Sequence, residues 1–169
     1  RAKCKSANAN WRGVRGLAVL PLRFAGDPVL GQIAAPVLQF DTGLGQCADD
    51  MLATMYDAKG RGLAGPQVGI TKRIFVIDTD WKDARPDPKV CVNPVITARS
   101  AEMAAGTEAC LSIPGKTYAV ARPAWIDAIW QDATGAGRAA RLHGVKAICF
   151  CHELVHLNGV LISDHGVLQ

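Results

Sequence analysis

The stretch "CFCHELVHLNG", residues 149–159, decides both the fold and the chemistry that this sequence predicts. Within it, His152, Glu153 and His156 spell H-E-x-x-H. Histidines at positions i and i+4 of a helix lie on one face, where their imidazoles can share a metal ion. Glu153 is rotated off that face but can reach a water molecule beside the ion and take its proton. The stretch therefore predicts a helix that carries two metal ligands and a base.

This helix is expected to begin near Val145 and to end at Asn158, with Gly159 as the residue after its C-terminus. Apolar residues occupy most of its faces, so we expect it to be central and buried. Two satisfied core histidines are the alternative to a metal site. Burying two histidines and a glutamate without a shared ligand would leave polar groups that are costly to desolvate, and the pattern therefore favours a metal.

A catalytic tetrahedral site needs a third protein ligand and one open position. The candidates are Cys110, Cys149, Cys151, His143 and His165. Cys149 lies only three residues before His152, so a chelate from one helix would be strained and core packing is expected instead. Cys110 lies in "GTEACLSIPG" (106–115), which we expect to be a loop after a strand. A ligand on a distant loop can approach the helix face freely, which favours Cys110.

Length and composition indicate one globular domain. The chain has 169 residues, of which 49% are hydrophobic and 20% charged, as is ordinary for soluble proteins. Its apolar runs are far shorter than a membrane span, and a net charge of +4 does not by itself indicate a nucleic-acid binder. We predict a flexible basic segment over residues 1–16 and a single catalytic domain over residues 17–169, with no membrane contact and no nucleic-acid binding motif.

The N-terminal region and the cysteines bear on the compartment. Residues 1–26 carry six basic residues and no acidic one, which is typical of an organellar transit peptide or its remnant; an ordinary solvated terminus is the alternative. Six cysteines suit disulfides in a secreted protein, but no secretory signal is visible. Reduced cysteines in an intracellular protein are therefore expected, in a mitochondrion, a plastid or the bacterial cytoplasm.

Local signals predict helices and antiparallel strands. Asp27 as N-cap and Pro28 at the first helical position predict a brief helix, and helical spacing of apolar residues predicts a longer one over 44–58. Strands are expected at 73–78, at 89–97, on either side of Pro123 and at 138–144, and the glycine-rich residues 60–70 are expected to form a loop. This order indicates an α+β fold in which antiparallel β-sheets pack around the H-E-x-x-H helix.

Three segments resemble the motifs of one family. The segments "GRGLAGPQ" (60–67), "EACLS" (108–112) and "CHELVH" (151–156) are similar, in order and spacing, to G-x-G-L-A-A-P-Q, E-G-C-L-S and Q-H-E-x-D-H of peptide deformylases. The resemblance covers about residues 17–165. It implies a peptide deformylase-like fold and a metal-dependent hydrolase that removes the N-formyl group from the initiator methionine of newly made polypeptides.

The resemblance also implies roles for the site residues. The three metal ligands would be Cys110, His152 and His156. Glu153 would be the general base and later the proton donor. The side-chain amide of Gln67 and the backbone N–H of Leu111 would stabilise the oxyanion of the tetrahedral intermediate. One divalent ion is implied, with Fe²⁺ as the first expectation, and a Cys/His/His set of mixed softness also accommodates Zn²⁺ and Ni²⁺.

Substrate contacts follow from the same resemblance. Gly62 would pair its backbone with the substrate chain, a role that suits a residue without a side chain, and Arg61 stands beside the same groove. The methionine side chain would enter an apolar pocket near Val145, Ile148 and Cys149. The implied partners are N-formylmethionyl nascent peptides met at the ribosome, and the enzyme is expected to be a monomer or a weak dimer.

The sequence departs from the family pattern at several positions. Ala109 stands where the family usually has glycine, Gly65 where it has alanine, and Cys151 where it has glutamine. Arg61 replaces a usually apolar residue, and Val155 replaces the aspartate of H-E-x-D-H. Loss of an acidic side chain that supports a metal site can weaken metal affinity or activity about 10- to 100-fold. We nonetheless expect a competent, divergent deformylase because every ligand and catalytic position is kept.

Two alternatives differ from this reading. A deformylase-like protein could keep the fold and the metal and have weak or lost turnover through Val155 and Ala109. A zinc endopeptidase shares H-E-x-x-H, but it normally takes a third histidine or a glutamate after the helix, and His165 is the only candidate. The contexts of Cys110 and Gln67 favour deformylation.

A further expectation concerns the segment that carries the cysteine ligand. Glu108 should pair with Arg122, fourteen residues later, because the family shows an acid and an arginine at this separation. An arginine that extends to solvent is the alternative. The pair would anchor the ligand-bearing segment to the next strand.

Overall fold

A computed structural model describes residues 16–169 of the chain. The prediction of a flexible basic segment therefore lies outside the described residues, apart from residue 16, and the single domain over residues 17–169 stays a prediction. Within the described part, no helix is both long and apolar enough to cross a membrane.

The larger of two sheets has five antiparallel strands in the order β1-β2-β3-β6-β7. Its strands are β1 (Gly62–Ala64), β2 (Ile74–Ile77), β3 (Lys89–Arg99), β6 (Trp125–Gln131) and β7 (Gly137–His143). All four residues of β2 are buried, which matches its continuous apolar run "IFVI". By contrast, β6 alternates buried and more exposed residues, as a strand with one face on the core does. Strand β1 forms one edge of this sheet, and within residues 16–169 it pairs with β2 alone.

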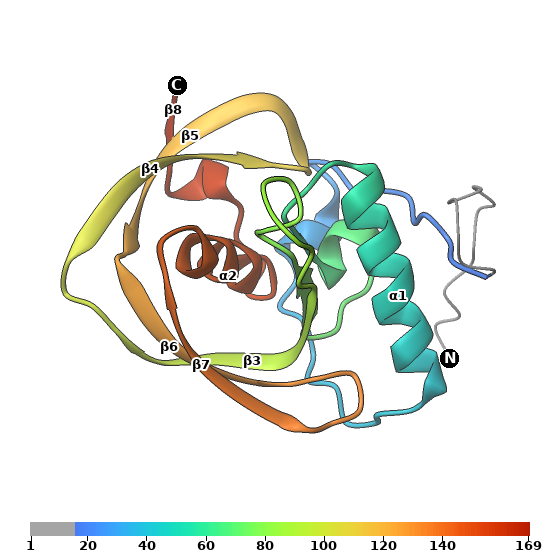
Figure 1. Cartoon of the computed structure of the whole chain (residues 1–169). Helices are drawn as coiled ribbons and strands as arrows, with labels where there is room; N and C mark the ends of the chain where they lie inside the picture. The colour runs from blue at the N-terminus through green and yellow to red at the C-terminus, as the bar shows by residue number, and fades with distance from the viewer. Residues whose placement is uncertain (1–15) are drawn as a thin grey trace.

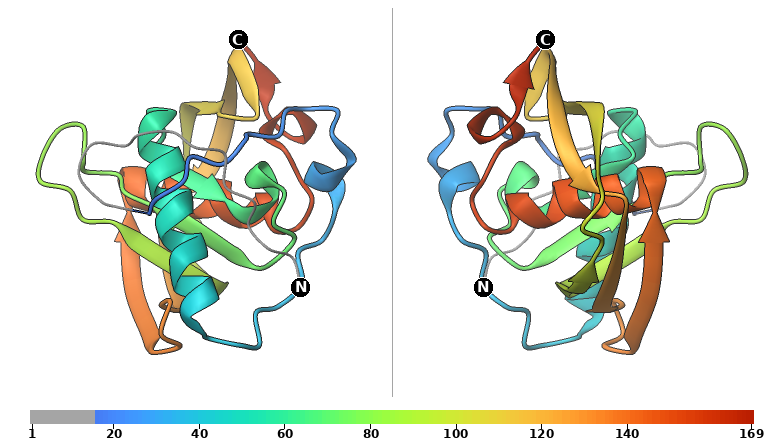
Figure 2. Two further views of the ribbon diagram at one scale, coloured as in Figure 1. Left: turned by 90° about the vertical axis from the view of Figure 1, so that its right-hand side faces the viewer. Right: turned by 90° about the vertical axis from the view of Figure 1, so that its left-hand side faces the viewer.

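The smaller sheet has three strands in the order β4-β5-β8. They are β4 (Met103–Cys110), β5 (Ile113–Pro123) and β8 (Val167–Leu168). Strands β4 and β5 form a long hairpin, and β8 lies beside β5 at the C-terminal end of the chain (Figures 1 and 2). The predicted division at Pro123 is confirmed, since β5 ends there and β6 begins at Trp125. A proline ends a strand readily because it has no N–H to donate.

Helix α1 (Thr42–Asp57) lies against one side of the larger sheet (Figure 1). It begins two residues before the predicted start, because Asp41 caps it by accepting a hydrogen bond from the Leu44 N–H at 3.0 Å. Met51 and Met55 are fully buried on its inner face. The brief helix predicted after Asp27 is a 3₁₀ turn, η1 (Pro28–Gly31), with Asp27 as its cap.

Helix α2 (Gly144–His156) occupies the centre of the molecule, and strands of both sheets surround it (Figure 1). Phe150 of α2 meets Phe75 of β2 edge-on, with ring centroids 5.0 Å apart, and lies 5.9 Å from Trp130 of β6. Such aromatic contacts anchor the helix in the main core. The predicted α+β arrangement of antiparallel sheets around the H-E-x-x-H helix is confirmed. The helix ends at His156, two residues before the predicted end.

Two predicted loops are instead regular structure. Residues 62–64 form β1 and are followed by a 3₁₀ turn, η2 (Gly65–Val68), because Leu63 pairs with Val76 and is fully buried. Cys110 is the last residue of β4 rather than part of a loop. The last residues of the chain, predicted only as a tail, form the turn η3 (Ile162–Asp164) and β8. In each case pairing with a neighbouring strand or core packing outweighs the local turn signal.

Candidate metal centre and active site

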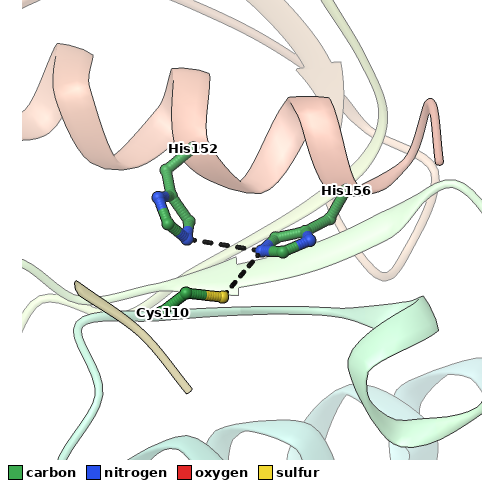
Figure 3. A group of neighbouring side chains, drawn as sticks. All are labelled: Cys110, His152 and His156. Atoms are coloured by element: carbon green, nitrogen blue, oxygen red, sulfur yellow. Dashed lines mark hydrogen bonds between the residues drawn. The ribbon is translucent and has the colours of Figure 1, made fainter. Parts of the chain in front are cut away.

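Three metal-ligating atoms converge between α2 and the end of β4. The side chains of His152 and His156 project from α2, and Cys110 faces them from a separate segment (Figure 3). His156 Nε2 lies 3.3 Å from His152 Nε2 and 3.4 Å from Cys110 Sγ. All three residues are buried and their ligand atoms lie within 4.8 Å of one another. The structure thus brings the predicted ligand set together.

These separations fit one shared ion. Bonds of about 2.0–2.3 Å to nitrogen and sulfur place the neighbouring ligand atoms of a tetrahedral ion roughly 3.4–3.6 Å apart. One thiol and two imidazoles form a donor set of mixed softness that suits zinc, iron or nickel. Among residues 16–169, this is the only group of three or more such side chains that could hold an ion. The chain therefore has the ligands for a single metal ion.

A buried ion pair holds His152 in place. Glu108 Oε2 lies 2.8 Å from His152 Nδ1, and Arg122 donates to both Glu108 oxygens, at 2.7 and 2.9 Å. The predicted pair of Glu108 and Arg122 is confirmed, while its contact with His152 was not foreseen. Burial alone would raise the pKa of Glu108, but the hydrogen bonds from Arg122 and His152 lower that pKa to about 2. An ionised carboxylate on Nδ1 leaves Nε2 directed at the ligand set.

The two histidines differ in their surroundings. Burial lowers the pKa of His152, but hydrogen bonds to Cys110 and Glu108 outweigh burial and raise it to about 10. A cation that binds this ring must therefore displace a proton. Burial, followed by the positive charge of His152, lowers the pKa of His156 to about 3, so this ring is neutral, as a metal ligand must be. His156 Nδ1 is buried and has no hydrogen-bond partner among the described residues.

Glu153 directly follows His152 in the sequence and lines a cavity next to the converging side chains. Its side chain is buried, and Oε2 has no hydrogen-bond partner in the described part of the chain. Burial raises the pKa of Glu153 to about 7, although the positive charge of His152 opposes the rise. A group with a pKa near 7 can both accept and return a proton at neutral pH, as a general acid–base catalyst requires.

The Glu153 carboxylate fits beside β1 because Gly62 has no side chain. A Cβ atom at position 62 would lie 2.3 Å from Glu153 Oε1 and 2.9 Å from Cys149 Sγ, which is far inside van der Waals contact. The sequence suggested that this residue lacks a side chain in order to pair with substrate. The structure adds a second reason, because β1 passes directly over the Glu153 carboxylate.

Gly62→Ala is expected to lower kcat/KM roughly 10- to 100-fold, because a shift of about 1 Å in a catalytic group can cost that much. Steady-state kinetics on a formylated peptide would measure the loss, with metal content as a second readout. Gly45→Ala is a matched control, since no atom lies within 4 Å of the added Cβ on α1. Wild-type kinetics in Gly62→Ala would contradict the proposed place of Glu153.

Gln67 is held with its amide donor toward the ligand set. The Ala64 N–H donates to Gln67 Oε1 at 2.8 Å, which turns Nε2 toward Ser112 Oγ (3.2 Å) and Cys110 Sγ (3.5 Å). Ser112 is fully buried. The sequence did not single out this serine, and its only signal was its place as the last residue of "EACLS". The arrangement fixes a donor beside the cysteine ligand.

A cavity of about 440 Å³ opens onto these groups, a size typical of small-ligand sites. His156 does not line the cavity and lies fully buried behind it. Leu111 lines it at the turn after the ligand cysteine. The other predicted site residues on its wall are Arg61, Gly62, Gln67, Cys110, Val145, Ile148, Cys149, His152 and Glu153. The structure therefore places all the predicted site residues in or beside one pocket.

The remaining candidate ligands lie elsewhere. His143 and His165 are exposed, and neither belongs to the metal-ligating group. Cys149 Sγ donates to the Arg61 carbonyl at 3.4 Å, in keeping with the packing role predicted for it. Because His165 lies outside this group, it does not supply the third ligand that a zinc endopeptidase would need.

The sequence model of one protein family, described as polypeptide deformylase, matches residues 19–168. The chain belongs to the polypeptide deformylase family. A peptide deformylase of Rhizobium meliloti is 42% identical over 149 residues, which cover 88% of this chain and 86% of the relative. The chain is accordingly an enzyme that removes the N-formyl group from newly made polypeptides.

Solved structures of peptide deformylases share this fold. The enzyme of Synechococcus elongatus, in complex with actinonin, has a TM-score of 0.84 and 41% identity, and the match covers 87% of this chain and 80% of that one. A Met-Ala-Ser-bound peptide deformylase of Acinetobacter baumannii has a TM-score of 0.81 and 35% identity over 87% of this chain and 98% of its own. Identity at this level extends the likeness from the fold to the family.

The structure accounts for one departure from the deformylase pattern. A Cβ atom at Gly65 would lie 2.6 Å from the Ile70 carbonyl oxygen and 3.1 Å from that of Lys72. The backbone after η2 therefore passes too close for the alanine usual in deformylases. Ala109, by contrast, points to solvent at the cavity wall, where a methyl group meets no such limit.

Proposed function

We propose that Cys110, His152 and His156 hold one divalent metal ion and that Glu153 is the general base in the removal of the N-formyl group. The observation that carries the proposal is the convergence of three buried ligand atoms within 4.8 Å. Two of these residues, Cys110 and His152, line the same cavity as Glu153, whose Oε2 is buried and has no hydrogen-bond partner among the described residues. When bound, the ion would polarise the formyl carbonyl and make nearby water more acidic.

Glu153 takes a proton from the water molecule that attacks the formyl carbon. Negative charge then develops on the formyl oxygen, where the Gln67 amide and the Leu111 backbone N–H donate hydrogen bonds. Glu153 returns its proton to the methionine nitrogen as the carbon–nitrogen bond breaks, and formate and a free amine result. The pKa of about 7 supports both halves of this transfer, because neither protonation state is strongly preferred.

The substrate enters along the edge of the larger sheet. The outer side of β1 pairs with no other strand of the described residues, so the backbone at Gly62 can bind an extended peptide as an added strand. Val145, Ile148 and Cys149 provide an apolar wall for the methionine side chain.

Further features of the enzyme belong to the same proposal. The likeness to peptide deformylases suggests Fe²⁺ as the native ion, and the Cys/His/His set is compatible with Fe²⁺, Zn²⁺ and Ni²⁺. We propose action on nascent chains at the ribosome, as a monomer or a weak dimer. The compartment would be one where formylated chains are made, either the bacterial cytoplasm or an organelle.

The decisive experiment combines metal analysis with hydrolysis of formyl-Met-Ala-Ser. We expect one metal ion per chain, release of formate, and loss of activity after treatment with a chelator that is reversed by added Fe²⁺ or Zn²⁺. Bound metal without formate release would instead identify the deformylase-like protein of lost turnover. Absence of both would contradict the proposal.

Val155 lies on α2 beside the end that Arg73 anchors. Arg73 Nη1 donates to Asn158 Oδ1 at 3.0 Å and lies 3.4 Å from the Leu157 carbonyl. Positions 155 and 158 lie one turn apart, so an aspartate at 155 would face the same guanidinium. Neighbouring residues of a helix diverge by about 100°, which keeps that carboxylate away from the His156 ring. Support for the metal site would therefore be indirect.

Val155→Asp is expected to raise metal retention after dialysis, or kcat/KM on a formylated peptide, by up to about tenfold, the lower end of the range for residues that support metal ligands. Val155→Asn is the matched control, because it has the same shape without the charge. An aspartate variant that unfolds, or that gains nothing over the asparagine variant, would show that the surroundings have adapted to valine.

A further inference from the structure

Cations surround the mouth of the catalytic cavity. The four basic residues that line it are Lys59, Arg61, Lys82 and Lys116. In the described part of the chain, the only acidic residues on its wall are Glu108 and Glu153, and both are buried. Glu108 is also neutralised by Arg122. The mouth of the cavity is therefore strongly positive compared with its floor.

The three lysines come from three separate segments. Lys59 follows the end of α1 in the left-handed conformation, with φ 57°. Lys82 lies on the loop between β2 and β3, which projects from the body of the molecule (Figure 2). Lys116 follows the tip of the β4–β5 hairpin. Positive charge thus reaches the entrance from three sides rather than from one run of sequence.

The three lysines are also free to act on a ligand. They are exposed, and none of them forms an ion pair with another described residue. Lys82 lies over the ring of Trp81, with Nζ 5.4 Å from its centroid, a contact that leaves the charge uncompensated. Arg61 differs, because its guanidinium contacts Asp83 at 2.5 Å and the Thr79 carbonyl. The lysines, not the arginine, supply the unpaired charge.

The part of the substrate that follows the formylated methionine must leave through the mouth of the cavity. The formyl group must reach Cys110, His152 and Glu153, which are at most 7% exposed and form the floor. The chain that follows the formylated methionine must then pass outward, from the buried floor to the exposed lysines. Because the formyl group removes the charge of the α-amine, only side chains of the next residues carry charge near the entrance.

We infer that this enzyme selects nascent peptides with aspartate or glutamate in the first residues after the formylmethionine. The inference rests on the proposed function, since it concerns the part of the same substrate that leaves the cavity. Lys59, Lys82 and Lys116 attract these carboxylates through exposed, solvent-screened contacts. Basic residues at the same positions of the substrate are disfavoured by the same charges.

Three formylated peptides, of which the glutamate and glutamine members are isosteric, test the inference. The peptides formyl-Met-Glu-Glu-amide, formyl-Met-Gln-Gln-amide and formyl-Met-Lys-Lys-amide differ in charge, and the C-terminal amide removes the terminal carboxylate. We expect kcat/KM to fall in that order, with the glutamate peptide on the order of three- to tenfold above the glutamine peptide, as two exposed charge contacts allow. The difference should shrink as salt rises toward 1 M, where the screening length is about 3 Å.

Variants locate the effect. In the triple variant Lys59→Gln, Lys82→Gln, Lys116→Gln, the ratio of kcat/KM between the glutamate and glutamine peptides is expected to fall to about one. The charge-matched control is Lys72→Gln, Arg138→Gln, Arg141→Gln, whose positions do not line the cavity. This control should keep the wild-type ratio, because these side chains lie outside the cavity and two of them already pair with aspartates.

Each other outcome overturns the inference. Equal kcat/KM for the glutamate and glutamine peptides at low salt, with the glutamine peptide hydrolysed, would overturn it alone and leave the proposed function standing. If no formylated peptide is hydrolysed, the proposed function fails and the inference falls with it. If the triple variant keeps the peptide order but loses affinity for a short RNA, the lysines serve nucleic acid and the inference is wrong.

Discussion

Glu153→Gln is expected to retain the metal ion and to lower kcat by at least about 10²-fold, the usual scale for a general acid–base group. Glutamine has the size of glutamate, so it fits beneath Gly62 without a new clash. It cannot accept a proton at neutral pH, so both the attack of water and the protonation of the leaving nitrogen lose their catalyst. The ligand set is untouched, because Glu153 is not one of the three converging ligands.

The experiment requires metal analysis and formate release on the same preparation. Glu102→Gln is the matched control, since it makes the same change at an exposed glutamate outside the cavity and should behave as wild type. Turnover within tenfold of wild type in Glu153→Gln, with metal bound, would remove this residue from the role of base.

Cys110→Ala is expected to reduce bound metal from one ion per chain to nearly none and to abolish formate release. Two imidazoles from one helix turn remain, but a stable site of this kind needs three protein ligands. The strand itself should persist, because alanine fits the end of β4 and the ion pair of Glu108 and Arg122 still ties β4 to β5. Inductively coupled plasma analysis after gel filtration measures the stoichiometry, and circular dichroism verifies the fold.

Cys151→Ala provides the comparison. Cys151 is also a buried free thiol, and it immediately precedes His152 on α2, but it is not one of the ligand-forming residues. Its replacement should leave one ion bound. If Cys110→Ala keeps full metal content while Cys151→Ala loses it, the cysteine ligand is assigned to the wrong residue.

Elements with strong periodic signals could be predicted from the sequence. The local pattern alone was enough to predict three elements. The apolar faces predicted α1 and α2, and the alternation of residues predicted β6. The prediction of a loop over the glycine-rich segment before Gln67 was wrong. The turn signals of this segment are local, whereas its pairing with β2 depends on residues more than ten positions away. Strand pairing of this kind responds to tertiary context more than to propensity.

The candidate site divides in the same way. The histidine pair and Glu153 could be read from spacing on one helix, and the pair of Glu108 and Arg122 from the family pattern. The contact of Glu108 with His152 could not, because it joins residues 44 positions apart. The clash that excludes any side chain at Gly62 likewise exists only after β1 has been placed over α2.

The position of α2 at the centre of both sheets has a thermodynamic consequence. His152 and His156 share this helix with Phe150, an anchor of the main core, whereas Cys110 lies 46 residues before His156 on the smaller sheet. A bound ion therefore cross-links distant parts of the chain, and because the unfolded chain lacks this arrangement, binding favours the native state by mass action. Folding and metal binding are then coupled equilibria. A shortage of the ion would lower the free energy of unfolding and favour proteolysis, in addition to removing activity.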